Sequence, residues 1–596
     1  MDKKTTDSTG IGRHPLLGWM LVFAVALALR VHYLHQIEGL VYFYHLVGDA
    51  AGYDEWGQRL AGGEWWWPET FYQAPLYPYF LAGTYKLLGH DTWALRLVQC
   101  VLGAAGCVMV ALAGDRFFSR RAGLAAGLLM ALYPPAIYFD GIVQKASLGF
   151  VLTAGLLWAL GTGAKRPSKW LWLTVGVLLG LLALTRENAL ALGPVVVAWL
   201  VFWLPSRSLR GPLPYGRGSD GTRGCPRTDR WAAVAMVVAG LGLTLLPVGF
   251  HNQRVGGEFS LTTFQMGPNF YMGNHAEADG RYKPMVAGRE TPQFERADAT
   301  MFAERAMGRT LTPREVSHYW LAQSWKYIRS DPFGWLRLLG LKWCLTWNRY
   351  EIPDTEGYFI YREFSPLLSL LGRVLHFGVL CPLAVLGVAL TWSRRRELAL
   401  LYVLALVTAG AVALFYVFGR YRLPLVPILG IFAGAGVVET LGCVTTRRWP
   451  ALAGALAIAL AAAVWVNWPI NPETKMNASQ WGNLGVVLAQ RDRLNQALPC
   501  FEQAVAMYPQ APRLQQFLAD ALSLAGRYAE AIPHYRKATQ LEPRRAHAHF
   551  NLAVALERVG RIDEAIEDYH KAVDIDPTDQ EALKAIERLT GANRSN

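Results

Sequence analysis

The chain has 596 residues, of which 53% are hydrophobic and only 17% are charged, whereas soluble globular proteins carry about 25% charged residues. This composition excludes a purely cytosolic enzyme, an intrinsically disordered chain and a disulfide scaffold, and it predicts that much of the chain faces lipid. The seven cysteines are scattered without a CxxC pair and the thirteen histidines show no ligand spacing, so no zinc site is predicted.

Eleven apolar segments are candidates for membrane-spanning helices, which need about 20 mostly apolar residues. The first of them has no small-residue cleavage site, so we expect a span and not a removed signal peptide. Together the segments predict an all-α fold, a polytopic helical bundle. The predicted spans are 15–35, 93–115, 122–139, 143–162, 169–185, 189–205, 231–250, 367–392, 398–418, 422–441 and 449–468.

The basic residues predict the orientation of this bundle. With the N-terminus in the cytoplasm, the inner segments hold twenty Lys and Arg residues, whereas the first outside loop, 36–92, holds only Arg59 and Lys86. The net charge of +13 is therefore a topology signal, and no nucleic-acid partner is expected. We expect a multi-pass protein of the plasma membrane, the inner membrane in a bacterium, with an extracytoplasmic C-terminus.

The first outside loop, 36–92, carries the most informative pattern. Asp49, Tyr53, Trp56 and Leu60 recur at helical spacing, which predicts a helix with an acid at the start of an aromatic face. Because the loop follows a span directly, this acid is expected at the boundary between water and lipid.

Two further polar segments interrupt the spans. The insert 206–230 is rich in Gly, Pro, Ser and Arg, and is predicted to be a disordered cytoplasmic loop. The segment 251–366 is a second outside region. Within it, 334–347 is apolar but too short to span, and it is predicted to be an interfacial helix, because counting it as a span would place the basic residues 394–396 outside.

The C-terminal residues 478–579 repeat with a period of 34. Small residues recur where two helices would cross, an aromatic residue would fill the groove between them, and a proline would end the second helix. The pattern resembles the tetratricopeptide repeat and predicts an α-solenoid over 478–590, with three repeats and a capping helix at 580–590, between a linker at 469–477 and a tail at 591–596. A protein partner is therefore expected, with a packing or dimerising role as the alternative. The repeating columns include Leu484/Leu518/Leu552, Ala497/Ala531/Ala565, Phe501/Tyr535/Tyr569 and Pro509/Pro543/Pro577.

The first loop resembles that of integral-membrane, lipid-sugar-dependent glycosyltransferases of the C-type fold, especially the protein O-mannosyltransferase-like and aminoarabinose-transferase-like enzymes. In that family an acid follows the first span, a tyrosine comes a few residues later, and a Pro-Leu-Tyr-Pro-like element precedes the next apolar helix. Asp49, Tyr53 and the element 75–78 match these features. Many members carry Asp-Glu at the acid, but Ala50 follows here, which leaves Asp54 as a rival.

Three later motifs extend the resemblance, namely 185–188 (TREN), 267–274 (GPNFYMGN) and 419–424 (GRYRLP), all at predicted outer ends of spans. The likeness covers roughly 15–468 as topology, and only the short motifs are specific. The two arginines of the last motif oppose the positive-inside trend, which favours a function for them.

The resemblance implies that a membrane domain, 1–468, transfers a sugar from a polyprenyl-phosphate donor to an acceptor hydroxyl or amine on the extracytoplasmic side, with inversion. The chemistry needs a carboxylate as base, Asp49 or alternatively Asp54, and cations for the departing phosphate. No cofactor is expected besides the lipid-linked donor. The candidate phosphate-binding cations are Lys86, Arg186, Arg420 and Arg422. The candidate substrate-binding residues are Tyr53, Tyr77, Glu187, Asn269, Tyr271, Asn274 and Tyr421.

Plainer roles stay open for these residues. Asp49 could cap a helix, Asp54 could lie on a solvated helix face, and Arg186 could lie at the interface paired with Glu187. No metal site is predicted, although Asp49 with a second acid could hold a divalent ion.

Three other functions predict sequence features that differ from those of this chain. A lipid-linked-glycan ligase or polymerase would place its key residues late in the chain, whereas the acid and aromatic features come first here. A transporter should show inverted repeats and charges within broken spans. A membrane-tethered repeat scaffold would not require Arg186 or Arg420 at the outer face.

Overall fold

The described part of the computed structural model comprises residues 15–203, 227–286, 289 and 291–593. All elements in these residues are helices, which confirms the predicted all-α class. The chain divides into two compact units. The membrane unit is Met1–Asp354 with Tyr361–Ile470, and the repeat unit is Thr355–Ile360 with Asn471–Asn596. Most of the predicted cytoplasmic loop 206–230 lies outside the described residues.

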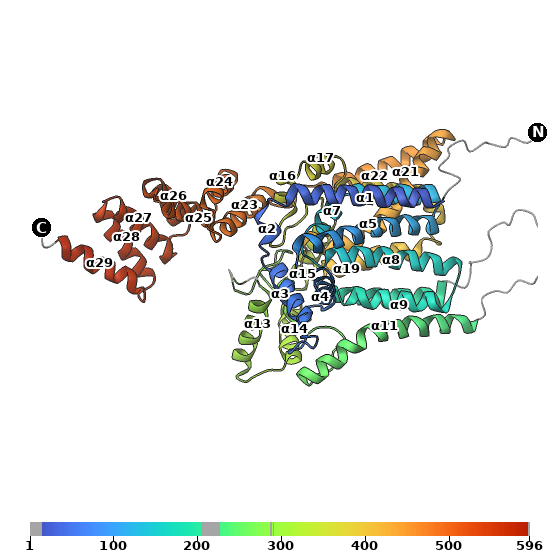
Figure 1. Cartoon of the computed structure of the whole chain (residues 1–596), viewed down its shortest axis with the longest axis horizontal. Coiled ribbons are helices and arrows are strands. Elements are labelled where there is room, and N and C mark those ends of the chain that lie inside the picture. The colour runs from blue at the N-terminus through green and yellow to red at the C-terminus, as the bar shows by residue number, and fades with distance from the viewer. Residues whose placement is uncertain (1–14, 204–226, 287–288, 290, 594–596) are drawn as a thin grey trace, which may run out of the picture. The chain divides into compact units, whose positions relative to one another are not determined.

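The membrane unit is a bundle in which long helices run side by side (Figure 1). Its bundle helices are α1 (Pro15–Ile37), α5 (Thr92–Phe117), α6 (Arg120–Leu132), α7 (Pro134–Asp140), α8 (Ala146–Lys165), α9 (Lys169–Ala183), η2 (Glu187–Ala191), α10 (Leu192–Ala198), η3 (Trp199–Trp203), α11 (Arg227–Gly256), α17 (Pro366–Val374), α18 (Phe377–Leu390), η5 (Trp392–Arg394), α19 (Ala399–Ala413), α20 (Gly419–Arg422), η6 (Leu423–Leu425), α21 (Val426–Thr445) and α22 (Trp449–Val466).

Each of the eleven predicted spans corresponds to helical structure, but their lengths differ. Among the described residues, seven helices are long and apolar enough to cross a membrane, or eight if the bent pair α6 and α7 forms one span. The other three, Lys169–Ala183, Glu187–Trp203 and Ala399–Ala413, fall in the shorter class of 10–17 residues. For these three, spanning stays a prediction.

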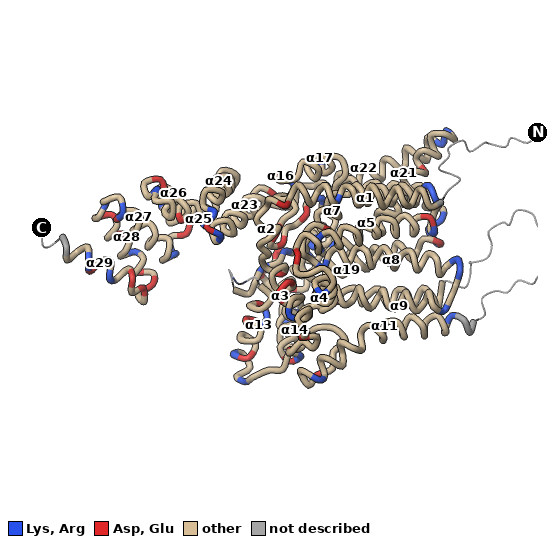
Figure 2. Tube along the Cα trace, in the orientation of Figure 1, with Lys and Arg blue, Asp and Glu red and all other residues tan. Residues whose placement is uncertain are grey.

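The charges of the membrane unit are unevenly placed. In Figure 2, Lys and Arg gather at the ends of α8, α9 and α11 that lie away from α3 and α13. The opposite end carries the helices of segments 36–92 and 251–366 (Figure 1). These helices are α2 (Val41–Tyr44), α3 (Asp49–Ala61), α4 (Leu76–Leu88), α12 (Met266–Gly273), α13 (Pro292–Met307), α14 (Pro313–Ser330), α15 (Pro332–Trp347) and α16 (Tyr358–Phe364).

A buried ion pair joins α1 to α7. Arg30 Nε lies 2.7 Å from Asp140 Oδ2, and both side chains are almost fully shielded from solvent. Gly103 on α5 makes room for this pair, because a Cβ there would lie 1.9 Å from Asp140 Oδ2. Removing one partner would leave an uncompensated buried charge, so the pair holds the α7 end firmly in place.

A second polar cluster on α5 fixes the turn after α7. Gln99 Nε2 donates to the carbonyl oxygens of Asp140 (3.0 Å) and Ile142 (2.8 Å), and Arg96 Nε donates to the oxygen of Gly141 (2.8 Å). The Tyr77 hydroxyl in turn donates to Gln99 Oε1 at 2.6 Å. Three successive carbonyls are thereby satisfied by buried donors, as a non-helical turn inside a bundle requires.

The predicted interfacial segment 334–347 forms most of α15. Its Lys342 is fully buried, and the ammonium donates to the Gly273 oxygen (3.0 Å), Asn274 Oδ1 (2.9 Å) and the Phe415 oxygen (2.9 Å). This helix therefore packs against protein through the face that carries Lys342, and its cation is satisfied by oxygens of the protein.

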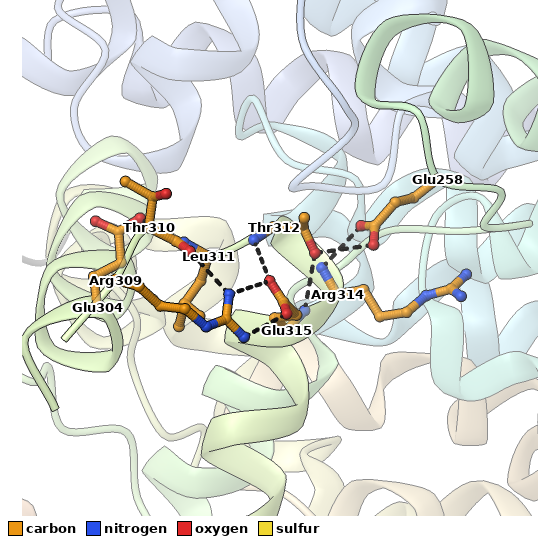
Figure 3. Close-up of polar contacts among 8 residues, drawn as sticks. All are labelled: Glu258, Glu304, Arg309, Thr310, Leu311, Thr312, Arg314 and Glu315. Atoms are coloured by element: carbon orange, nitrogen blue, oxygen red, sulfur yellow. Dashed lines mark hydrogen bonds and ion pairs between the residues drawn. The ribbon is translucent and has the colours of Figure 1, made fainter. Parts of the chain in front are cut away.

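The start of α14 is anchored by a network of polar contacts (Figure 3). Thr312 and Glu315 form a reciprocal capping box, and Arg309 binds Glu315 through both nitrogens of its fork. Glu258, which follows α11, accepts from the Thr312 hydroxyl (2.9 Å) and from the Arg314 backbone N–H (3.1 Å). The network ties the first turn of α14 to the chain leaving α11.

The repeat unit contains the three helix pairs and the capping helix that the 34-residue period predicts. Its close crossings depend on small residues, since a Cβ at Gly485 would lie 2.6 Å from the Phe501 ring. The first helix begins at Glu473, so the linker is shorter than the predicted 469–477. The helices are α23 (Glu473–Ala489), α24 (Leu494–Met507), α25 (Pro512–Leu524), α26 (Tyr528–Leu541), α27 (Ala546–Arg558), α28 (Ile562–Ile575) and α29 (Gln580–Asn593).

Candidate functional site

Asp49, the first residue of α3, is held in a chain of charged groups. Its Oδ2 lies 2.6 Å from Nη1 of Arg420, which also lies 2.7 Å from Oδ2 of Asp354. The Gln73 amide donates to Asp49 Oδ1 at 3.4 Å. One arginine therefore bridges two carboxylates that are far apart in the sequence.

Electrostatics keep the Asp49 carboxylate ionised. Burial on its own would raise the pKa of Asp49, but the positive charges of Arg420 and Lys145 and the hydrogen bonds from Arg420 and Gln73 oppose it, and the pKa falls below the ordinary value of 3.8. An ionised carboxylate at this position can accept a hydrogen bond, and then a proton, from an approaching hydroxyl.

Two further cations, Arg186 and Lys145, lie close to this centre. Arg186 Nη2 donates to the Arg420 backbone oxygen at 2.9 Å, and its guanidinium carbon lies 4.5 Å from the Tyr421 ring centre. Lys145 Nζ lies 5.7 Å from the Tyr53 ring centre. Both residues are at most 8% exposed. In the described part of the chain neither is ion-paired with a carboxylate. Both positive charges are therefore shielded from solvent and available to bind an anion.

Both cations line a cavity of about 560 Å³. Tyr421 also lines this cavity, and so does Arg314 from the first turn of α14. The lining has three cationic residues against the single carboxylate of Glu187, and this excess of positive charge favours an anionic ligand. We call it the cationic cavity.

An apolar pocket adjoins the cationic cavity. Arg186 and Tyr421 line both. The remaining walls of the pocket are mostly aliphatic, among them Leu156, Leu182 and Leu404, from α8, α9 and α19. The volume of this apolar pocket is only about 30 Å³, so it has room for no more than a small group.

The structure brings seven of the sequence-predicted site residues together around the ion-paired centre and the cationic cavity. Glu187 accepts from the Thr263 hydroxyl and from Gln265 Nε2 (3.2 Å), and Asn269 Oδ1 accepts from the Tyr416 hydroxyl (3.2 Å). The seven residues are Asp49, Tyr53, Arg186, Glu187, Asn269, Arg420 and Tyr421.

Asp54, the rival acid, lies in a separate network. It accepts from the Tyr85 hydroxyl (2.5 Å) and Gln58 Nε2 (2.7 Å) and lies 2.9 Å from Nε2 of His90. Since these groups belong to α3, α4 and the turn after α4, the contacts fasten two helices together, and neither Asp49 nor Arg420 is among its partners.

Two predicted phosphate-binding cations lie elsewhere. Lys86 is exposed on α4 and lies 4.9 Å from the ring centre of Trp65. Arg422 is buried, pairs with Glu351 Oε1 at 2.6 Å and donates to the Tyr350 backbone oxygen at 3.2 Å. Neither cation lines the cationic cavity.

Three predicted substrate-binding residues have packing roles in the structure. Tyr77 belongs to the buried cluster on Gln99. Tyr271 packs 4.5 Å from the Trp320 ring centre. Asn274 donates to the Leu414 oxygen and accepts from Lys342, and is fully buried.

Sequence reasoning missed Lys145 and Asp354. A signal for Lys145 existed, because it lies at the outer end of the predicted span 143–162, where a positive charge opposes the positive-inside trend just as Arg420 does. Asp354 carried no signal, since it lies in a long polar segment without a motif. Among the described residues, no three His, Cys, Asp or Glu side chains are grouped so as to hold a metal ion.

Comparisons with known proteins agree with the sequence resemblance. A family model described as dolichyl-phosphate-mannose-protein mannosyltransferase matches residues 72–219, and two tetratricopeptide-repeat models match 476–543 and 518–580. These matches confirm the predicted combination of a membrane glycosyltransferase domain and C-terminal tetratricopeptide repeats. A search of curated proteins found no match.

Solved structures give partial likenesses. The apo oligosaccharyltransferase of Archaeoglobus fulgidus is 14% identical, over 78% of this chain and 58% of that one, with a TM-score of 0.44. The first tetratricopeptide-repeat domain of Spaghetti (RPAP3), solved with an HSP90 peptide, is 20% identical over 20% of this chain and 93% of that one, with a TM-score of 0.19. The repeat protein YrrB is 20% identical over 38% of this chain and 90% of that one, with a TM-score of 0.18.

Proposed function

We propose that the protein transfers a sugar from a polyprenyl-phosphate-linked donor to an acceptor hydroxyl, with inversion at the anomeric carbon. The observation that carries the proposal is the pair of shielded cations, Arg186 and Lys145, which face one cavity without carboxylate partners. The two cations suit the phosphate of such a donor.

The site divides the reaction among its residues. As the acceptor oxygen attacks the anomeric carbon on the side away from the phosphate, its proton passes to Asp49. The C–O bond to the phosphate breaks, and polyprenyl phosphate leaves with the electron pair. Arg186 and Lys145 hold the charge that grows on the departing phosphate, as preorganised cations in a shielded site do. One carboxylate suffices, because direct displacement needs a base and no covalent intermediate.

Donor binding tests the assignment of the two cations. Lys145→Ala and Arg186→Ala should each weaken binding of radiolabelled polyprenyl-phosphate mannose by roughly tenfold or more, since a charge-assisted hydrogen bond contributes about 1.5–3 kcal/mol. The exposed cation Lys86 supplies the matched control, and Lys86→Ala should bind the donor normally. Equal affinities in all three variants would assign Arg186 and Lys145 to packing and remove the basis of the proposal.

We further propose that the cationic cavity faces the extracytoplasmic side, that the membrane is the inner membrane of a bacterium, and that the repeats lie in the periplasm and recruit a protein acceptor or partner. Support comes from the positive-inside distribution of the sequence. A reporter that is active only outside the cytoplasm, fused after Asn596, should be active. Activity only from a cytoplasmic reporter would overturn this orientation.

A further inference from the structure

The cationic cavity has a third cation, Arg314, to which the proposed phosphate site assigns no part. Arg186 and Lys145 are shielded from solvent, whereas Arg314 lies on α14 and is exposed. The cavity therefore has a shielded end and an end that is open to solvent. A polyprenyl-phosphate sugar is a phosphodiester with one negative charge, which the two shielded cations can hold between them. Arg314 is then available to contact another part of the ligand.

The network at the start of α14 leaves the charge of Arg314 without a counter-charge. The carboxylates of Glu258 and Glu315 are both occupied by other donors. Glu258 accepts from the Thr312 hydroxyl (2.9 Å) and from the backbone N–H of Arg314 (3.1 Å), and both oxygens of Glu315 accept from Arg309. Figure 3 shows the Arg314 side chain running away from the Arg309–Glu315 pair. Within the described ranges its guanidinium forms no ion pair with a carboxylate.

The guanidinium of Arg314 is nevertheless held in place. Its Nη2 donates to the backbone oxygen of Phe259 at 2.7 Å, and its other two nitrogens make no hydrogen bond within the described residues. Because the group is already fixed at one nitrogen, it loses less conformational entropy when it binds a ligand. Its remaining N–H groups keep the planar fork that matches a carboxylate.

Polar side chains surround the cations in the same cavity. Hydroxyl, amide and imidazole groups of this kind form hydrogen bonds with sugar hydroxyls, so the glycosyl group of a donor would share the cavity with Arg314. The lining residues of this kind include Thr262, Thr263, Gln265, Asn269, Ser317 and His318.

Resting on the proposed function, we propose that the sugar carried by the donor is acidic, a uronic acid, and that Arg314 binds its carboxylate. A neutral sugar would leave the guanidinium without a counter-charge in the occupied cavity, whereas a carboxylate pairs with it through two parallel hydrogen bonds. An amino sugar would bring a like charge to the same place. Arg314 is therefore a residue that determines which sugar the donor carries.

Two lipids that differ in a single group test this inference. Radiolabelled polyprenyl-phosphate mannuronate and polyprenyl-phosphate mannose differ only at C6, which is a carboxylate in the first and a hydroxymethyl group in the second. The readout is the ratio of their Kd values, and the parent should bind the mannuronate lipid more tightly by about fivefold or more. In Arg314→Gln, which can still donate to the Phe259 oxygen, the ratio should fall toward unity.

Two further variants separate a specific contact from a general effect of charge. Arg314→Lys restores the charge without the fork, so it should recover only part of the preference. Lys326 is exposed on the same helix outside the lining, and Lys326→Gln should keep the ratio of the parent. Equal affinities for the two lipids in the parent would overturn the inference. An unchanged ratio in Arg314→Gln would overturn it as well, because Arg314 would then act on both donors alike.

Failure of this inference is distinguishable from failure of the proposed function. Normal binding of the mannose lipid by Lys145→Ala and Arg186→Ala removes the basis of the proposed function, whereas the C6 comparison depends on Arg314 alone. If neither lipid binds, mannuronate 1-phosphate and mannose 1-phosphate repeat the comparison without a lipid tail. A preference for mannuronate 1-phosphate that disappears in Arg314→Gln would support the inference, and the absence of any preference would overturn it.

Discussion

Asp49 combines two properties at one residue: it begins α3, and it is ion-paired with Arg420. Asp49→Asn keeps the size of the side chain and its contact with Gln73, while Arg420 keeps Asp354 as a partner. We therefore expect a folded protein whose single-turnover transfer rate falls by about 10²–10⁴.

The rival carboxylate provides the control for this experiment. Asp54→Asn removes contacts between α3 and α4 but no group near Arg420, so the transfer rate should change far less. A larger loss in the Asp54 variant than in the Asp49 variant would move the catalytic base to Asp54.

Glu295 on α13 supplies a pH dependence. Burial raises its pKa, the hydrogen bond from Tyr282 lowers it, and the charges of Asp49 and Asp354 raise it again, with a result of about 7. The folded carboxyl therefore keeps its proton more readily than the unfolded one, whose pKa is 4.5. The contribution of Glu295 to the free energy of unfolding is therefore fully present below pH 4.5, and it is lost as the pH rises through about 7.

Thermal unfolding of the purified protein tests this predicted loss of stability with rising pH. The parent should lose stability between pH 5 and pH 8, and Glu295→Gln, which keeps an acceptor for Tyr282, should lose less over the same interval. An identical change in both proteins would mean that Glu295 does not titrate in this window.

At the scale of residues, the sequence located part of the site and missed part of it. Asp49 and Arg420 were predictable because each lies in a short motif at a predicted span end. Arg422 belongs to the same motif, but it is neutralised by Glu351, and no local pattern records that partner. Lys145 lies one residue before the observed helix α8, but the predicted span 143–162 includes it. The sequence pattern therefore places it within an apolar helix and does not mark it as a site residue.

At the scale of elements, α5 acts on the site through the turn that follows α7. Gln99→Leu removes two donors from the carbonyls of Asp140 and Ile142, and with them the fixed position of Lys145 a few residues later. We expect the Kd of the lipid-linked sugar donor to rise in Gln99→Leu. Most of this loss of affinity should disappear when Gln99→Leu is introduced into the Lys145→Ala variant.

This non-additivity separates positioning from general damage. Val101, exposed on the same helix, gives a matched control, and Val101→Ala should leave the donor Kd unchanged. Losses that simply add in the Gln99→Leu, Lys145→Ala double variant would show that Gln99 acts on the fold and not through Lys145.

The boundaries of the elements were less predictable than their existence. The predicted span 122–139 is a pair of helices bent by 60° at Tyr133, where Pro134 and Pro135 follow. Proline cannot donate to the preceding turn, so the helix breaks there. Hydropathy recorded the apolar character of the segment but not its bend.

Across the whole molecule, the repeat unit can be predicted from local sequence patterns, whereas the site in the membrane unit cannot. The repeats obey a local period of 34, so their helices were predictable one by one. The site in the membrane unit joins residues that are 371 positions apart, Asp49 and Arg420, and spacing alone cannot reveal such a contact.

Truncation tests the role of the repeats. Deleting 512–596 removes the second and third repeats but retains α23, whose Gln480 packs against Gly357. Transfer to a short peptide should remain nearly intact, while transfer to a whole protein acceptor should fall, because tethered binding surfaces act by raising local concentration. Loss of both activities in a folded truncation would make the repeats part of the catalytic unit.

The buried pair of Arg30 and Asp140 exists only because position 103 has no side chain, since a Cβ would lie 1.9 Å from the carboxylate oxygen. A relative that replaces Gly103 must also replace Asp140. A relative that replaces Asp140 alone leaves the Arg30 cation buried without a partner among apolar helices. The three positions therefore change together or not at all. Covariation of glycine, aspartate and arginine across relatives would mark descent of this bundle even where the motifs around the site have diverged.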